Sequence, residues 1–322
     1  MSTRTSITAL AAAALTAAVL ASFGAAPSMA ATAPLSNAQI GVHFDLAKGQ
    51  LPENIAAAPH SGSYVTFAAS RQIAHISSTG KTTILATLPL PAGGGVKTPA
   101  LGFPLTTGIV RGQDGTLYFG YATGTADLTG IWKLTPGGTA HRITALPATG
   151  LPNGLALDTR TGTLYVADSI VGAIYSVPVT GGPAKIWSTA TELATTGFLG
   201  VNGLKIRGGA VWATNLDKGI VLLRIPITRH ARAGTVETIA TGLPGIDDFA
   251  FTGEGDTLLA AIDTKNTVEL VKRNGTHRVV LDATDGLQGP TSLAVRGTTV
   301  TVLSAAYLTK KDPNLLRAHL TH

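Results

Sequence analysis

Six polar residues recur along the chain at nearly equal intervals, each at the start of a short apolar run. Neighbouring members are 44 to 54 residues apart. In chain order they are Glu53, Thr107, Asn153, Asn202, Asp247 and Thr291. Four of them carry a carboxylate or an amide oxygen, and none is His or Cys. If the fold brings these positions together, their oxygen atoms can bind a hard divalent cation.

The ligand types indicate which cation to expect. The chain has no cysteine, which excludes disulfide scaffolds, thiolate zinc sites, iron–sulfur clusters and cysteine nucleophiles. Four oxygen ligands would leave two or more positions of a calcium ion open to water and substrate. Two carboxylates buried together would repel each other, and a bound cation would remove that cost. We therefore expect Ca²⁺, with Mg²⁺ or another divalent cation as the alternative.

An internal repeat explains the equal spacing. Its clearest copy is LPNGLALDTRTGTLYVADS (151–169), in which two apolar runs flank a polar turn. Further short runs follow, such as 172–179 and 184–190. Six copies with four short strands each, at a period near 47 residues, predict an all-β fold, a six-bladed β-propeller. A β-sandwich is the alternative fold, but it does not account for six copies in phase.

The two ends of the chain predict how the ring closes. The last copy contains three strand-like segments, of which 314–320 is the third. Segment 39–46 lies before the first copy and supplies a spare strand. We expect this N-terminal strand to join the last blade, because closure leaves no blade incomplete.

Residues 1–30 are typical of a secretory signal peptide. Arg4 is the only charged residue, an apolar stretch runs from Ile7 to about Ala26, and small residues at 28 and 30 predict cleavage after Ala30. A transmembrane anchor is the alternative, because a stretch of about 20 apolar residues can span a bilayer. The short basic start and the small-residue site favour cleavage. We expect a secreted, extracellular domain over 31–322, with no membrane attachment after cleavage.

Composition narrows the class of partner. With 44% hydrophobic and 13% charged residues, the chain does not have the composition of a disordered protein. The formal net charge of +6 comes from scattered basic residues, so nucleic acid is not expected as a partner. We expect a monomer that acts on a small molecule.

In a propeller, the first strand of each blade lines the central channel, so the six recurring residues would form a ring. Each proposed ligand also has a structural interpretation. Asn153 and Asn202 could fill a turn at the strand entry, and Glu53 could be a solvated loop residue. Asp247 could form an Asx turn, in which case Asp248 would be the functional acid. The shared phase of the four favours a metal site.

The second strands should bring the chain back to the level of this ring. Residues at their ends could orient the ligands, line the entrance or bond a neighbouring blade. These residues are Asp168, Asn215, Asp217, Asp263 and Tyr307. The candidates for substrate contact or ligand support are Asp168, Asn215 and Tyr307, together with Thr107, Asp248 and Thr291.

The repeat motifs also resemble a known family. Segments 151–169 and VNGLKIRGGAVWATN (201–215) resemble the SMP-30/gluconolactonase/LRE-like family and the related diisopropyl fluorophosphatase. The resemblance implies a six-bladed propeller with one calcium or other divalent ion in the channel. Such proteins take a Glu from blade one, Asn from blades three and four, and an Asp from blade five. Glu53, Asn153, Asn202 and Asp247 match in that order.

The resemblance also implies a reaction. It points to hydrolysis of lactones or related esters, with the metal polarising the carbonyl and Asp247 as base or nucleophile. The chain has no clear counterpart of the sugar-orienting Arg of animal lactonases. It carries Thr291 where some phosphotriesterase-like relatives have a histidine. These departures argue against sugar lactones and organophosphates as particular substrates.

Three functions therefore follow from the sequence. The first is a secreted, divalent-metal-dependent lactonase or esterase. The alternative is a non-catalytic propeller, resembling NHL proteins, that binds a ligand or partner with a structural metal or none. A lyase or strictosidine-synthase-like activity on the same scaffold is the third, and no residue of the sequence favours it.

Overall fold

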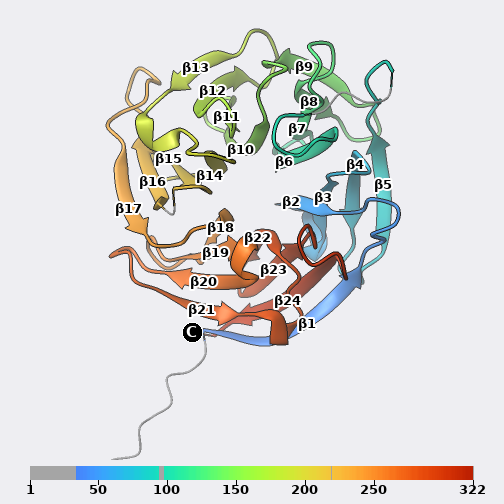
Figure 1. Ribbon diagram of the computed structural model, residues 1–322, viewed down its shortest axis with the longest axis vertical. Coiled ribbons are helices and arrows are strands. Elements are labelled where there is room, and N and C mark those ends of the chain that lie inside the picture. The colour runs from blue at the N-terminus through green and yellow to red at the C-terminus, as the bar shows by residue number, and fades with distance from the viewer. Residues whose placement is uncertain (1–33, 94–97, 219, 322) are drawn as a thin grey trace, which may run out of the picture. The chain divides into compact units, whose positions relative to one another are not determined.

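The computed structural model describes residues 34–93, 98–218 and 220–321, which form six four-stranded antiparallel sheets around a common axis (Figure 1). The predicted all-β, six-bladed propeller is therefore confirmed. The compact unit spans Ala33–His322, and the predicted signal segment 1–30 lies outside the described residues. No helix in the described part of the chain is long and apolar enough to cross a membrane.

Each blade runs from an inner strand at the axis to an outer strand at the rim. Blade one consists of β2 (Pro52–Ala57), β3 (Ser63–Phe67), β4 (Gln72–Ile76) and β5 (Thr82–Thr87). Blade two consists of β6 (Leu105–Arg111), β7 (Leu117–Ala122), β8 (Gly130–Leu134) and β9 (His141–Ala145). Blade three consists of β10 (Pro152–Asp158), β11 (Thr163–Asp168), β12 (Ala173–Pro178) and β13 (Lys185–Ser188).

The second half of the ring repeats this order. Blade four consists of β14 (Val201–Arg207), β15 (Ala210–Asn215), β16 (Ile220–Pro226) and β17 (Glu237–Thr241). Blade five consists of β18 (Ile246–Phe251), β19 (Leu258–Ile262), β20 (Thr267–Val271) and β21 (His277–Leu281). Single 3-10 turns are η1 (Pro59–Ser61), η2 (Thr191–Leu193), η3 (Asp263–Lys265) and η4 (Ala283–Asp285).

Blade six combines both ends of the chain. It consists of β22 (Pro290–Arg296), β23 (Thr299–Ser304), β24 (Asn314–Leu320) and the N-terminal strand β1 (Leu35–His43). Strand β1 pairs with β24, with Gln39 opposite Arg317. The predicted closure by an N-terminal strand is confirmed, although the strand begins and ends earlier than the expected 39–46. Its alternating burial is typical of an outer strand with one face in solvent.

The hydrophobic core lies between neighbouring blades. Strands β7, β15 and β19 are buried at every residue, because a blade packs on both sides of each of them. Aromatic side chains fill the wedge between blades. For example, Trp212 of blade four meets Phe251 of blade five with ring centroids 5.2 Å apart. Each blade is therefore stabilised by its two neighbours, and the inner strands are held close to the axis.

Side-chain hydroxyls also connect the blades near the axis. Five of them donate to a backbone carbonyl on the inner strand of the next blade, over 2.7 to 2.9 Å. These pairs are Thr66 with Thr107, Thr107 with Pro152, Ser169 with Val201, Thr214 with Asp247, and Thr291 with Pro52. These hydroxyl bridges fix the inner strands relative to one another.

Candidate metal centre

A register shift occurs in each of the six inner strands at the recurring polar residue. The pairing of β10 with β11, for example, is irregular between Pro152 and Leu155, where Asn153 lies. The other five inner strands show the same shift at the equivalent place. A bulge takes a residue out of the pairing ladder and turns its side chain. A bulge at these positions can therefore turn the side chain toward the channel or, as for Thr107 and Thr291, toward the backbone of the next blade.

The glycines beside the ligand residues permit close approach of the blades. A Cβ atom at Gly154 would lie 2.1 Å from the carbonyl oxygen of Asn202, and one at Gly108 would lie 2.3 Å from that of Asn153. Neither glycine has a positive φ. The Asn–Gly pairs are therefore not hairpin turns, because the glycine follows the ligand position to admit the backbone of the next blade.

Glu53 is a buried acid with one hydrogen bond that orients it. Its side chain accepts from the hydroxyl of Tyr307, with 2.5 Å between Oε2 and the phenolic oxygen. Burial raises the pKa of Glu53 to about 7, the Tyr307 hydrogen bond opposes the rise, and the charges of Asp263 and Asp248 add to it. The carboxylate form of Glu53 is thus destabilised in this place.

Asp247 lies in the same acidic group. Burial raises its pKa well above the usual value, and repulsion by Glu53 is the next largest cause. A hydrogen bond from the Asn202 side chain lowers the pKa of Asp247, but by less than burial raises it. No lysine or arginine contributes to the shift of either Glu53 or Asp247. Two buried carboxylates without a cationic side chain are the arrangement that a divalent cation would stabilise.

Asn153 reaches the channel from blade three. Its amide nitrogen donates to the hydroxyl of Ser169 over 3.1 Å, and that hydroxyl donates to Val201. This leaves the amide oxygen as the atom that can bind a cation. Among the residues that the structure describes, Asn153 makes no hydrogen bond to Glu53 or Asp247.

The donor set fits a calcium-like ion. Within the described residues, no group of three or more His, Cys, Asp or Glu side chains is arranged to hold a metal ion. The candidate ligands differ from such a group, since they combine the two carboxylates of Glu53 and Asp247 with the two amides of Asn153 and Asn202. Oxygen donors of both kinds are usual for Ca²⁺. The carboxylates of Glu53 and Asp247, which have no cationic side chain beside them, would attract the cation.

Asp248 occupies a different position from Asp247. The ammonium group of Lys205 lies 2.7 Å from both of its carboxylate oxygens, and Asn54 donates to one of them over 3.2 Å. Lys205 also lines a cavity of about 320 Å³ at the far ends of β2, β6 and β10. The ion pair therefore lies between this cavity and the Glu53–Asp247 group. Lys205 thus pairs with Asp248, whereas no lysine or arginine contributes to the pKa shift of Asp247.

The remaining sequence candidates hold the fold around the site. The hydroxyls of Thr107 and Thr291 bridge blades, as described above. Asp168 accepts the backbone N–H groups of Leu151, Ile170 and Val171 through Oδ1. The amide of Asn215 donates to the carbonyls of Glu192 and Ala194. Tyr307 hydrogen-bonds a candidate ligand, Glu53.

Two further residues shape the site. The negative charge of Asp263 raises the pKa of Glu53, Asp247 and Tyr307. Burial raises the pKa of Asp263 itself to about 6. The sequence indicated Asp263 as one of the residues at the ends of the second strands, but not as a member of the acidic group. Lys205 gave no such signal. Its role depends on an ion pair with an acid 43 residues further along the chain.

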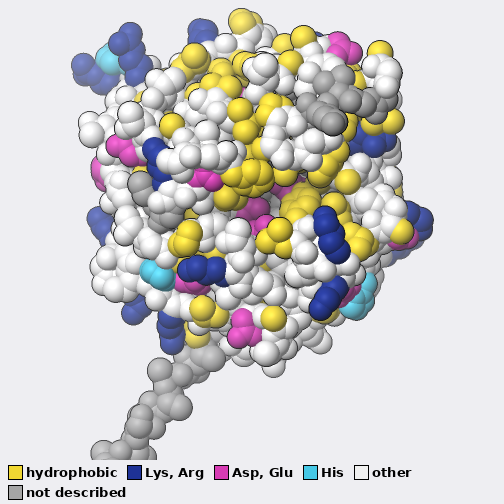
Figure 2. Space-filling view, in the orientation of Figure 1, with side chains coloured by type: hydrophobic (Ala, Val, Ile, Leu, Met, Phe, Trp, Pro, Cys, Tyr) yellow, Lys and Arg dark blue, Asp and Glu magenta, His cyan; other side chains and the backbone are white. Residues whose placement is uncertain are grey.

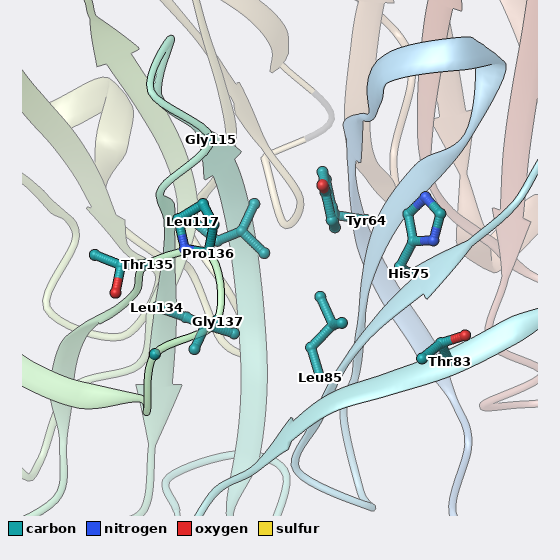
Figure 3. Close-up of a pocket in the computed structure, with 11 residues that line it drawn as sticks. Tyr64, His75, Thr83, Leu85, Gly115, Leu117, Leu134, Thr135, Pro136 and Gly137 are labelled. Atoms are coloured by element: carbon teal, nitrogen blue, oxygen red, sulfur yellow. The ribbon is translucent and has the colours of Figure 1, made fainter.

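A larger cavity lies elsewhere in the ring. It has a volume of about 430 Å³ and lies between blades one and two. Figure 3 shows Tyr64 and His75 on one side of it and Pro136 on the other. None of the candidate ligands lines it.

Comparison with known proteins supports the fold. No protein-family model and no characterised protein sequence matches the chain. A gluconolactonase from Xanthomonas campestris has a similar structure, with a TM-score of 0.63 and 14% identity, over 90% of this chain and 96% of that one. Regucalcin from Agrobacterium tumefaciens, a calcium-binding protein, has a TM-score of 0.61 and 15% identity over 87% and 95%.

A lyase shares the same fold. Virginiamycin B lyase from Staphylococcus aureus, in a catalytically inactive histidine-to-alanine variant, has a TM-score of 0.59 and 17% identity, over 85% of this chain and 82% of that one. At these identities, the three likenesses establish the propeller fold. The gluconolactonase and regucalcin neighbours agree with the resemblance drawn from the repeat motifs.

Proposed function

We propose that this chain is a divalent-metal-dependent hydrolase of lactones or related esters, with Ca²⁺ as the expected ion. The observation that carries the proposal is the pair of buried acids Glu53 and Asp247, which repel each other and have no cationic partner. The fold shared with a gluconolactonase and with a calcium-binding regucalcin supports it.

In this proposal, the residues at the inner-strand bulges bind the metal, and one of them also takes part in the reaction. Glu53, Asn153, Asn202 and Asp247 would hold the cation, which when bound would polarise a substrate carbonyl and stabilise the oxyanion. Asp247 is the base that takes a proton from the attacking water, or the nucleophile itself. Asn202 orients Asp247 through its hydrogen bond, and Tyr307 orients Glu53.

Metal content is the decisive measurement. Protein equilibrated with millimolar calcium should retain a bound divalent ion, and Glu53→Gln should lose it. Glu237→Gln is the matched control, because Glu237 is an acid on outer strand β17 that pairs with Arg224. Wild-type protein without bound divalent ion under these conditions would overturn the proposal.

Activity separates the hydrolase from a binding protein. Hydrolysis of a lactone and ester panel should stop on chelation and in Asp247→Asn. Full activity of Asp247→Asn would remove Asp247 from the mechanism. A metal-loaded protein that hydrolyses none of the panel would instead be the non-catalytic propeller.

The lyase is inactive when one of its histidines is replaced by alanine. The six inner strands of this chain contain no histidine. Lyase chemistry therefore has less support from this chain than hydrolysis.

We also propose that residues 1–30 direct export and are removed after Ala30. The amino-terminal residue of protein collected from the culture medium tests this. An intact Met1 on exported protein would contradict it.

A further inference from the structure

One apolar cluster lies beside the candidate metal centre, at the face where the inner strands begin, which we call the upper face. Its buried members include Leu51 and Leu151, each two residues before a candidate ligand, and Leu199, three residues before another. Members come from blades one, two, three, four and six. Figure 2 shows a hollow near the middle of the ring, with acidic side chains inside it and hydrophobic side chains around its edge.

Blade five contributes no residue to this cluster among those that the structure describes. It supplies the acids Asp247 and Asp263 instead. The mouth of the channel therefore combines the acids Asp247 and Asp263 of blade five and Glu53 of blade one with the apolar cluster on the other blades. A ligand that contacts both the acids and the cluster has a polar reacting group at one end and an apolar group at the other.

Two large apolar side chains stand in solvent at this mouth. Phe198 is 45% exposed and Leu308 is 67% exposed. Phe198 precedes Leu199 of the cluster, and Leu308 follows Tyr307, which bonds Glu53. Exposed apolar side chains next to a binding site are typical of a surface that a ligand covers.

The loop that carries Phe198 is held in place. The carboxylate of Asp217 accepts the hydroxyl of Thr195 and the backbone N–H groups of 196–199. Burial opposes ionisation of Asp217, but these hydrogen bonds prevail and hold its pKa below the usual value. The phenyl ring of Phe198 is thus presented by a fixed loop. Such preorganisation reduces the entropy that a ligand must lose on binding.

Several polar groups at this mouth already have partners. Asp168, Asn215 and Asp217 bond the backbone of the loops, and the hydroxyl of Tyr307 bonds Glu53. Asp168 and Asp263 each keep one buried carboxylate oxygen without a hydrogen-bond partner. A polyhydroxylated substrate needs many free donors and acceptors, because each unpaired polar group buried on binding costs free energy. This mouth offers few.

We propose that the site takes lactones or esters that carry an apolar alkyl or aryl substituent. The carbonyl faces Glu53 and Asp247, and the substituent covers Phe198 and Leu308. This inference rests on the proposed hydrolase function and names its substrate class.

The test compares γ-lactones of increasing alkyl length with gluconolactone. For the first few methylenes, kcat/KM should rise about fourfold for each one buried. Phe198→Ser and Leu308→Ser should each reduce the ratio of long-chain to short-chain kcat/KM by about tenfold. Val279→Ser is the matched control, since Val279 is 51% exposed on outer strand β21 and should leave the ratio unchanged.

A binding measurement separates the two proposals. Calorimetry with a γ-alkyl lactam, which resists hydrolysis, reports the apolar contact without turnover. Binding that strengthens with chain length and weakens in Phe198→Ser supports the inference, even if no lactone is hydrolysed and the hydrolase proposal fails. Hydrolysis that prefers gluconolactone, or that ignores chain length, overturns the inference and leaves the hydrolase standing.

Discussion

The charge of Glu53 should make the metal-free protein less stable at high pH. The pKa of Glu53 is 4.5 in an unfolded chain and about 7 in the fold. Below pH 4.5 both states hold the proton. As pH rises from 4.5 to 7, the unfolded chain ionises while the fold retains its proton, so the fold loses stability. At about 1.4 kcal/mol per pH unit, the loss reaches about 3 kcal/mol above pH 7.

Glu53→Gln removes this penalty, since the amide is neutral at every pH. Its oxygen can still accept the Tyr307 hydroxyl. In a chelator at pH 8, the variant should therefore be about 3 kcal/mol more stable than wild type, and at pH 4.5 the two should be alike. With calcium the order should reverse, because an ion at 1,000 times its dissociation constant stabilises the wild type by about 4.1 kcal/mol, which exceeds the penalty of about 3 kcal/mol.

Denaturant unfolding at pH 4.5 and pH 8, each with chelator and with calcium, measures the free energy of unfolding of both proteins under the four conditions. Glu237→Gln is the control for a change of net charge and should show no such reversal. If chelated Glu53→Gln is less stable than wild type at pH 8, the buried acid is not destabilising and the reasoning is refuted.

Two further changes test the surroundings of the site. Lys205→Met should lower the free energy of unfolding by about 3 to 5 kcal/mol, because it leaves Asp248 buried without its cation. Adding Asp248→Asn should recover most of the loss. If stability does not recover, Lys205 acts through packing alone. Gly154→Ala should cost about 3 kcal/mol and reduce bound metal, since its methyl would lie 2.1 Å from the carbonyl oxygen of Asn202. Gly197→Ala, with no atom within 4 Å of the new methyl, should change neither thermal unfolding nor metal content, and equal effects of the two alanines would contradict the steric explanation.

The sequence predicted the blades because each repeat is a local pattern. The six copies, the turns between strands and the spare N-terminal strand all follow from residues close together in the chain. The bulges were not predicted, since a bulge appears only when two strands pair in a given register. For the same reason, the sequence left Asp247 and Asp248 as alternatives. The ion pair of Lys205 with Asp248 depends on contacts that form only in the closed ring.

The assignment of Asp168 shows a different limit. The residue has the type and position of one that contacts substrate or supports a ligand, but its Oδ1 atom accepts three N–H groups of its own blade. Such bonds depend on the exact path of two loops. A polar residue at the end of a strand therefore indicates that it has a partner, and the sequence does not say whether that partner is the backbone or a ligand.

The ring positions show why two of the six recurring residues are threonines. Blades with Glu or Asn at this position can bridge to the next blade through a hydroxyl at the second strand, as Thr66 and Thr214 do. In blade two, Thr107 itself makes the bridge, and the second strand has Gly120, where a methyl would lie 2.2 Å from the Thr107 hydroxyl. At each of these contacts between neighbouring blades, one hydroxyl makes the bridge, and it comes from either the inner strand or the second strand. In blades one, three and four, a hydroxyl on or just after the second strand makes the bridge, so the residue at the bulge, Glu53, Asn153 or Asn202, is available for a ligand.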